Sequence, residues 1–201
     1  MHLLITGGAG FIGSNLADHF LNKGYHVTIF DNLSRGGVER NLDWLQANHP
    51  KRLRIVKGDV RDFDAVRAVV SEANVIFHLA AQVAVTTSVT DPRTDLEVNA
   101  WGTFNVLEAA RQGGRNPALI FTSTNKVYGG LEHVETAEEE TRYRLVDYPD
   151  GVPETCPLDF HSPYGCSKGA ADQYVRDFAR IYGLRSVVFR MSCIYGPRQF
   201  G

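Results

Sequence analysis

Short apolar runs alternate with longer amphipathic stretches along the whole of this 201-residue chain. The apolar runs contain many β-branched and aromatic side chains, as strands buried on both faces of a sheet do. These runs occupy residues 2–6, 26–30, 53–57, 74–79, 118–123 and 186–190. The amphipathic stretches repeat apolar side chains every three or four residues, which predicts helices at 11–23, 38–48, 63–72, 95–111 and 162–182.

Strands that alternate with helices in this way predict an α/β fold, with a doubly wound parallel sheet covered by helices on both faces. Each crossover between parallel strands is expected to be right-handed. Two helix ends carry clear local signals, because Asp62 is a suitable N-cap and Gly183 a suitable C-terminal stop. The pattern predicts a single domain over residues 1–201.

Residues 130–161 interrupt the alternation. This stretch is polar, contains three prolines, and has three consecutive glutamates at 138–140. A loop of this length inside a compact domain is usually functional, so we expect an active-site loop, with a solvated surface excursion as the alternative. The chain stops soon after the apolar run at 186–190 with no further helix. We therefore expect a second, C-terminal half of the protein to be missing from this sequence.

Composition narrows the class of protein. A net charge of −2 predicts no bulk attraction to nucleic acid or to an anionic membrane. The longest apolar runs fall well short of the roughly 20 residues that span a bilayer, and the first residues lack a signal peptide's features. The three cysteines have neither Cys-x-x-Cys nor metal-ligand spacing. We expect a soluble cytoplasmic protein with reduced cysteines and no metal site.

A glycine-rich turn joins the first predicted strand to the first predicted helix. It reads Gly7, Gly10, Gly13 at intervals of three, with Phe11 and Ile12 opening the helix. Glycines let the backbone turn sharply and let a pyrophosphate reach the helix N-terminus, where free N–H groups and the helix dipole favour an anion. A lone glycine motif is weak, but this strand–turn–helix position predicts a dinucleotide site, and an ordinary turn is the alternative.

Asp31 ends the second predicted strand, where a carboxylate can accept hydrogen bonds from both hydroxyls of an adenosine ribose. The same charge repels a 2′-phosphate, so the sequence favours NAD over NADP. Arg35 lies close enough in sequence to offset that repulsion. Asp59 and Val60 follow the third strand and are expected beside the adenine, although Asp59 also suits a turn or a helix cap.

Tyr164 and Lys168 stand four residues apart at the start of the helix predicted at 162–182. Residues with this spacing share one helix face, so the ammonium can approach both the phenol and a cofactor ribose. A free tyrosine has a pKa of about 10, and an adjacent Lys⁺ together with a positive nicotinamide favours the phenolate. On an isolated helix the pair would be an ordinary surface pair, but after the fifth βα unit it predicts a general base.

Small hydroxyl side chains end the fifth predicted strand at residues 122–124. The carboxyl ends of parallel strands are where open α/β sheets bind ligands. Thr124 is thus expected to orient a sugar hydroxyl toward Tyr164, although a small hydroxyl at a strand end often has no such role.

Several motifs resemble those of the extended short-chain dehydrogenase/reductases, which modify nucleotide-diphosphate sugars and carry an NAD-binding Rossmann fold. The matching runs are GGAGFIG at 7–13, HLAA at 78–81, STNKVYG at 123–129, YGCSK at 164–168 and YGPRQ at 195–199. The resemblance implies Thr124, Tyr164 and Lys168 as the catalytic triad. It places Asn32, Ser34, Arg35, Leu79, Ala80, Ala81 and Asn99 along the cofactor. It also puts Arg190 and residues 195–197 near the pocket.

Longer runs resemble the branch of this family that inverts C2 of a CDP-linked dideoxyhexose with bound NAD. They lie at 30–35, 82–88, 140–143, 158–174 and 194–200. The resemblance implies an isomerase of nucleotide-sugar metabolism that serves lipopolysaccharide O-antigen biosynthesis. It also implies that the missing C-terminal part is a substrate-binding part. It also implies a homo-oligomer, a dimer or tetramer, whose subunits meet through the helices at 95–111 and 162–182.

There are three alternatives to a 2-epimerase: two other reactions of the family and a protein without catalytic activity. The family's 4,6-dehydratases place an acid–base Asp-Glu pair after the threonine, whereas this chain has Asn125 and Lys126, so dehydration is disfavoured. A UDP-sugar 4-epimerase would use the same triad and NAD, and only the placement of the sugar would differ. A non-catalytic NAD-binding fragment also stays open, although the tyrosine and lysine are both intact.

Overall fold

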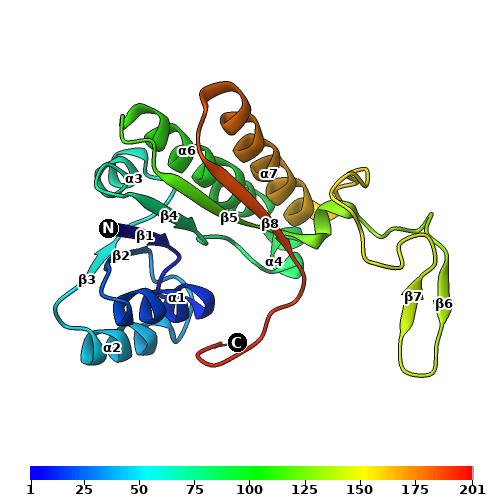
Figure 1. The fold of residues 1–201 in the computed structure, drawn as a ribbon, viewed down its shortest axis with the longest axis horizontal. Coiled ribbons are helices and arrows are strands. Elements are labelled where there is room, and N and C mark those ends of the chain that lie inside the picture. The colour runs from blue at the N-terminus through cyan, green and yellow to red at the C-terminus, as the bar shows by residue number, and fades with distance from the viewer. Residues whose placement is uncertain (201) are drawn as a thin grey trace.

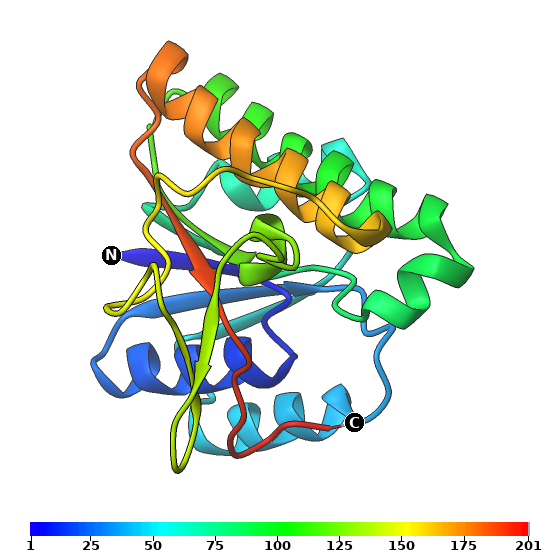
Figure 2. The same ribbon diagram turned by 90° about the vertical axis from the view of Figure 1, so that its right-hand side faces the viewer.

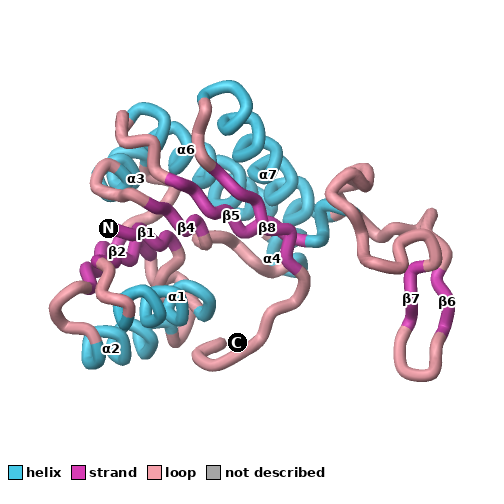
Figure 3. Tube along the Cα trace, in the orientation of Figure 1, coloured by secondary structure: helices cyan, strands magenta, loops and turns pink. Residues whose placement is uncertain are grey.

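The computed structural model describes residues 1–200 and shows three layers, with helices on both faces of a central sheet (Figures 1 and 3). The sheet is wholly parallel, in the order β3-β2-β1-β4-β5-β8. Its strands are β1 (His2–Thr6), β2 (His26–Asp31), β3 (Leu53–Lys57), β4 (Val75–His78), β5 (Ala118–Thr124) and β8 (Ser186–Met191). This is the strand order of a dinucleotide-binding doubly wound fold, so the expected fold class is confirmed.

Two separate cores hold the helices to the sheet. One face of the sheet packs against α1 (Phe11–Asn22) and α2 (Val38–Asn48), with Leu3 and Ile5 of β1 buried between them. The other face packs against α3 (Phe63–Val70), α6 (Gly102–Gln112) and α7 (Ser162–Tyr182). Because side chains alternate along a strand, Leu4 lies in this second core while its neighbours lie in the first.

The helix expected at 95–111 begins earlier than its apolar pattern indicates. It is a continuous run of α5 (Pro92–Leu96), a π-helical turn η1 (Glu97–Trp101) and α6. Asp91 caps it by accepting a hydrogen bond from the Thr94 backbone N–H, with proline in the first turn. A short helix, α4 (Val85–Thr90), precedes it and was not expected from the sequence.

The stretch at 130–161 contains structure of its own. It includes an antiparallel hairpin, β6 (Thr136–Glu138) and β7 (Tyr143–Leu145), which projects beyond the sheet (Figures 1 and 2). The base of the stretch packs on a 3₁₀ turn, η2 (Asn125–Tyr128), through a small apolar cluster that includes Val127 and Cys156. The segment is therefore anchored at the cleft end of β5.

Within residues 1–200, no helix has the length and apolar character needed to cross a membrane. All three cysteines are free: Cys156 is buried, and Cys166 and Cys193 are exposed.

Candidate active site

A cleft of about 610 Å³ opens at the carboxyl ends of the parallel strands. Its walls come from the turn after β1, the ends of β2 and β5, the loop after β4, the start of α7 and the segment after β8. The predicted site residues that line it are Gly7, Gly10, Phe11, Ile12, Gly13, Asp31, Asn32, Ser34, Arg35, Val60, Leu79, Ala80, Ala81, Thr124, Tyr164 and Lys168. The topology thus brings the glycine turn, the hydroxyl side chains at the end of β5 and the Tyr164–Lys168 pair together in this cleft.

The glycine turn is shaped so that side chains do not fit. Gly7 has φ +68°, and a Cβ on it would lie 2.7 Å from the backbone nitrogen of Ala80. A Cβ on Gly13 would lie 2.5 Å from the Gly7 carbonyl oxygen. The first turn of α1 can therefore sit directly behind the cleft with its free N–H groups facing it, which is the arrangement that binds a diphosphate.

Asp31 reaches back to the glycine turn. One carboxylate oxygen accepts a hydrogen bond from the Ala9 N–H at 3.0 Å, and the other accepts from the Leu33 N–H at 2.9 Å. Burial raises the pKa of Asp31 above its ordinary value, and these backbone hydrogen bonds oppose the rise. A carboxylate oxygen has more than one lone pair, so both oxygens keep capacity for a ligand hydroxyl.

Asp59 lies behind the wall. It accepts from the Asn32 side-chain amide at 3.0 Å and forms an ion pair with Arg61 at 2.8 Å. Hydrogen bonds from Arg61 hold the pKa of Asp59 well below its usual range. Asp59 thus orients Asn32 and Arg61, which themselves line the cleft.

Asn99 is also buried behind the wall, at 1% exposure. Its side chain exchanges hydrogen bonds with the backbone N–H and carbonyl of Gln82, at 2.9 and 3.1 Å. Asn99 therefore shapes the loop after β4, which forms part of the cleft. Arg190 is likewise turned inward, toward Asp172 and Tyr128, while Ile194 and Gln199 on either side of the 195–197 turn line the cleft.

Lys168 is 3% exposed and lies against the end of β5. Its ammonium donates to the Thr122 carbonyl at 2.6 Å and sits 4.3 Å from the centre of the Phe121 ring. Burial lowers the pKa of Lys168 to about 7, although the charges of Asp172 and Asp95 oppose that shift. The Lys168 amine, which lines the cleft, can therefore gain or lose a proton near neutral pH.

Tyr164 is half-buried, and this burial raises the pKa of its phenol above the ordinary value. The neighbouring Thr124 hydroxyl opposes the rise and the charge of Asp95 adds to it. The Lys168 ammonium is directed at the Thr122 carbonyl, so the expected effect of Lys168 and a nicotinamide on the phenol stays a prediction. Thr124 itself is 7% exposed and accepts from the Lys126 N–H at 3.2 Å.

Ser123 is the site residue that sequence reasoning missed. It is 6% exposed, lines the cleft, and carries the only buried side-chain polar atom without a hydrogen-bond partner among residues 1–200. Buried hydroxyls without a partner are uncommon in folded proteins. Its place between two threonines was the available signal. Asn125 and Lys126 also line the cleft, beside Thr124.

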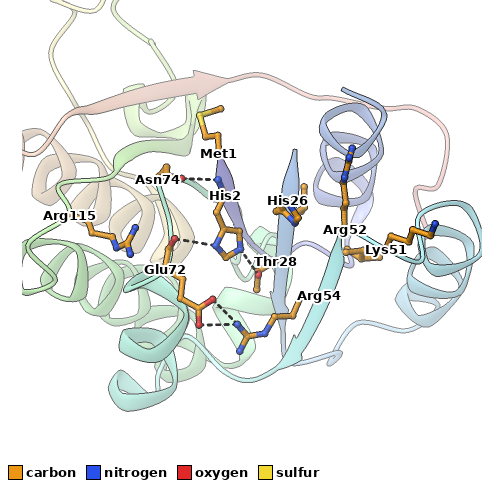
Figure 4. Close-up of a pocket in the computed structure, with 12 residues that line it drawn as sticks. Met1, His2, His26, Thr28, Lys51, Arg52, Arg54, Glu72, Asn74 and Arg115 are labelled. Atoms are coloured by element: carbon orange, nitrogen blue, oxygen red, sulfur yellow. Dashed lines mark hydrogen bonds and ion pairs between the residues drawn. The ribbon is translucent and has the colours of Figure 1, made fainter. Parts of the chain in front are cut away.

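A second hollow, of about 460 Å³, lies at the amino ends of β1 to β3 (Figure 4). Its central groups satisfy one another: His2 contacts the Glu72 carbonyl and the Thr28 hydroxyl, and Arg54 pairs with the Glu72 carboxylate. The lysine and the other arginines around it point in different directions (Figure 4). The cleft at the carboxyl ends is the better candidate for a functional site.

The fold is the doubly wound α/β fold of dinucleotide-binding proteins, and its cleft contains a tyrosine–lysine pair. The family model of GDP-mannose 4,6 dehydratases matches residues 4–201. The chain belongs to the NAD-dependent epimerase/dehydratase family of extended short-chain dehydrogenase/reductases.

Relatives in this family differ in their reactions. The chain is 54% identical over 202 residues to the CDP-paratose 2-epimerase of Salmonella typhi, covering all of this chain and 59% of that protein. It is 37% identical to a dTDP-glucose 4,6-dehydratase of Mycolicibacterium smegmatis, covering 99% of this chain and 55% of that protein. The chain thus spans little more than half the length of the curated relatives it matches.

Solved structures agree with the fold. The UDP-glucose 4-epimerase of Thermus thermophilus in complex with NAD has a TM-score of 0.78 and 36% identity, covering 100% of this chain and 58% of that one. A dTDP-glucose 4,6-dehydratase of Streptomyces venezuelae with NAD bound has a TM-score of 0.83 and 33% identity, covering 99% and 58%.

Proposed function

We propose that the natural gene product containing this chain is an NAD-dependent nucleotide-sugar epimerase that inverts C2 of CDP-paratose or CDP-tyvelose through a transient 2-keto sugar. The observation that carries the proposal is the meeting of Thr124, Tyr164 and Lys168 with the glycine turn in one cleft. The 54% identity to a CDP-paratose 2-epimerase favours this branch of the family. The curated relatives are longer than this chain, which covers 59% and 55% of the two named above, and we propose that the remainder of the protein takes part in substrate binding.

The cleft suits NAD on two independent grounds. The glycine turn packs backbone against backbone, since a Cβ at Gly7 or Gly13 would lie 2.7 or 2.5 Å from a backbone atom, and α1 begins directly after this turn. Asp31 offers a carboxylate at the end of β2, and its charge opposes a 2′-phosphate. Arg35 does not cancel that charge by an ion pair, because its guanidinium donates to the Phe200 carbonyl at 3.1 Å.

Bound NAD would supply a reversible two-electron oxidation with no net redox change over a full cycle. The side chains of this chain handle the proton. Tyr164 as phenolate accepts the proton of the C2 hydroxyl during oxidation and returns it during reduction, while Thr124 orients that hydroxyl. The ammonium of Lys168, one helical turn away, favours the phenolate when it turns from the Thr122 carbonyl toward the phenol. Inversion requires the flat keto sugar to present its other face before reduction.

Asn125 and Lys126 argue against the dehydratase reaction. Elimination of water requires groups that donate and recover a proton beside the threonine, and an amide does not do this at neutral pH. Both residues line the cleft. A 4-epimerase is the second candidate, since the UDP-glucose 4-epimerase of Thermus thermophilus shares the fold at 36% identity.

The test is to incubate the natural gene product with CDP-paratose, UDP-glucose and UDP-galactose separately, and to assign the products by NMR. We expect CDP-tyvelose to be the only product, and we expect a Tyr164→Phe variant that folds normally but loses about 10²–10⁴-fold in turnover, the contribution of a general base. Conversion of UDP-glucose alone would favour the 4-epimerase. A folded protein that binds NAD and converts none of the three would leave the non-catalytic alternative.

We also propose that two copies associate through α6 and α7, which run side by side on one face of the sheet (Figures 1 and 2). Their outer surface carries exposed aromatic and aliphatic side chains, notably Trp101, Tyr174, Ile181 and Tyr182. An apolar patch of this kind typically marks a protein interface. Sedimentation equilibrium of the purified protein tests the proposal, and a monomeric mass would refute it.

The free cysteines support a reducing compartment, and we propose that the protein acts in the cytoplasm.

A further inference from the structure

A buried acidic residue, Asp95, contacts Ser167, which lies between Tyr164 and Lys168 on α7. Asp95 has no exposed surface, and its carboxylate accepts three side-chain hydrogen bonds. The donors are Ser167 at 2.5 Å, Gln82 at 3.0 Å and Asn99 at 3.1 Å. All three donors are neutral, so they fill hydrogen-bonding positions of the carboxylate without cancelling its negative charge.

These hydrogen bonds join two walls of the cleft. Gln82 lines the cleft in the loop after β4, and its side chain also bonds the backbone of Ala84. Ser167 lies in α7, immediately before Lys168. A parallel contact, from the Tyr164 N–H to the buried Ser88 hydroxyl at 3.2 Å, ties the start of α7 to the same region. Asp95 thus fixes the register of α7 against the cofactor side of the cleft.

The charged groups around Lys168 leave Asp95 without another counter-ion. Asp172, one turn along α7, forms a two-point ion pair with Arg190 at 2.9 Å for both contacts. His78 of β4 is fully buried and neutral, because burial lowers its pKa to about 3. Tyr164 is the remaining titratable neighbour. Among residues 1–200, Asp95 takes part in no ion pair within 4.0 Å.

We propose that Asp95 is a positioning residue for the Tyr164–Lys168 pair, whose buried negative charge keeps the Lys168 ammonium charged while its hydrogen bonds hold α7 against the cleft loop. A buried carboxylate without a cation is costly, and so is a buried ammonium without an anion, so each stabilises the charged form of the other. The catalytic meaning of this role rests on the proposed function. The effect of the Asp95 charge on Lys168 can be measured without a sugar substrate.

The test measures the pKa of Lys168 directly by NMR, in protein labelled with ¹³C at the lysine ε carbon. Relative to wild type, Asp95→Asn is expected to lower that pKa by about one unit or more, the size of shift an opposite charge produces at close range. Two matched controls separate charge from structure. Ser167→Ala removes one hydrogen bond to Asp95 but keeps the negative charge of Asp95. Asp91→Asn removes the negative charge of the residue that caps α5, the helix that contains Asp95. Both are expected to leave the Lys168 pKa within about 0.3 units.

A reciprocal experiment keeps the proposal falsifiable if Asp95→Asn does not fold. Lys168→Met should raise the pKa of the Asp95 carboxyl, measured by ¹³C NMR, because the interaction energy is shared by both partners. An unchanged Lys168 pKa in folded Asp95→Asn, or an equal fall in Ser167→Ala, would overturn the proposal. So would an unchanged Asp95 pKa in Lys168→Met. The epimerase proposal is tested by its products and can fail independently of these titrations.

Discussion

Asp31 combines two roles that are separable by experiment. Its carboxylate holds the glycine turn through Ala9 and Leu33, and it also lines the cleft where an adenosine ribose would lie. We predict that Asp31→Ala weakens NAD binding by about 10–100-fold, the value of one hydrogen bond to a charged group. Binding of NADP should weaken less or improve, because the repulsion of its 2′-phosphate is removed.

Isothermal titration with both cofactors checks this prediction. Equal losses for NAD and NADP would mean that Asp31 only supports the turn. Gly36→Ala is a suitable control, because nothing lies within 4 Å of a Cβ at that position.

His78 makes the fold sensitive to acid. Its ring bridges the Thr6 and Thr103 hydroxyls at 2.6 and 3.0 Å, and burial lowers its pKa to about 3. Between that value and the ordinary pKa near 6.5, the unfolded chain binds a proton that the folded chain does not. His78 therefore makes stability rise with pH across this window, by up to about 1.4 kcal/mol per pH unit.

Urea unfolding of wild type and His78→Gln between pH 4 and 7.5 measures this contribution. The loss of stability on acidification should be shallower in the variant, whatever its absolute stability. Parallel slopes would show that His78 is not the group responsible.

At the scale of elements, a buried ion pair joins β8 to α7. Arg190 contacts Asp172 through two hydrogen bonds and donates to the Tyr128 hydroxyl of η2 at 2.8 Å. The side chain of Asp172 has no exposed surface and that of Arg190 is 10% exposed. We predict that Arg190→Met costs about 3–5 kcal/mol of unfolding free energy, because it leaves a buried carboxylate unpaired.

Chemical denaturation measures the cost. The matched control is Arg67→Met, since the Arg67–Asp64 pair is 59% and 81% exposed and such pairs contribute about 0–1 kcal/mol. Similar losses in the two variants would contradict the argument.

The elements that the sequence predicted well are those with a strong local pattern. The parallel strands and the helices α1, α2 and α7 follow apolar periodicity and end signals such as Gly183, which has φ +70°. Residues 85–90 did not reveal a helix, because valine and threonine are poor helix formers. The helix forms through tertiary contacts, with the buried Ser88 bonded to the Tyr164 N–H.

The residues of the candidate site likewise fall into those that the sequence predicted and those that it did not. The glycine turn, Asp31 and the Tyr–Lys pair follow recognisable spacing, so their meeting in one cleft was predictable. The network of Asp95, Gln82 and Ser167 was not, because each residue comes from a different element and the spacing of the motifs does not show which side chains contact one another. The hairpin at β6 and β7 was likewise hidden, because its strands are only three residues long.

For the whole molecule, residues 192–200 form a strap that leaves β8 and crosses back to α1 and α2 (Figure 1). Arg198 is its main attachment: the guanidinium lies 3.3 Å from the centre of the Trp44 ring and donates to the Asn15 side chain at 3.3 Å. The strap also contributes Ser192, Cys193, Ile194 and Gln199 to the cleft wall.

We predict that Arg198→Ala releases NAD several-fold faster than wild type, because a cation on an aromatic ring contributes about 0.5–2 kcal/mol to closing the strap. Stopped-flow displacement of NADH fluorescence measures the rate. Arg93→Ala, a largely exposed arginine on α5, is the control and should leave the rate unchanged. An unchanged rate in Arg198→Ala would show that the strap does not limit dissociation.

On this prediction, the strap would set the rate at which the cofactor exchanges. If the prediction holds, a bound dinucleotide would leave no faster than residues 192–200 separate from Trp44 and Asn15. A catalyst that must restore its own oxidation state in every cycle gains from such slow exchange, because a reduced cofactor lost halfway would strand the oxidised sugar. We expect the protein to keep its dinucleotide through purification.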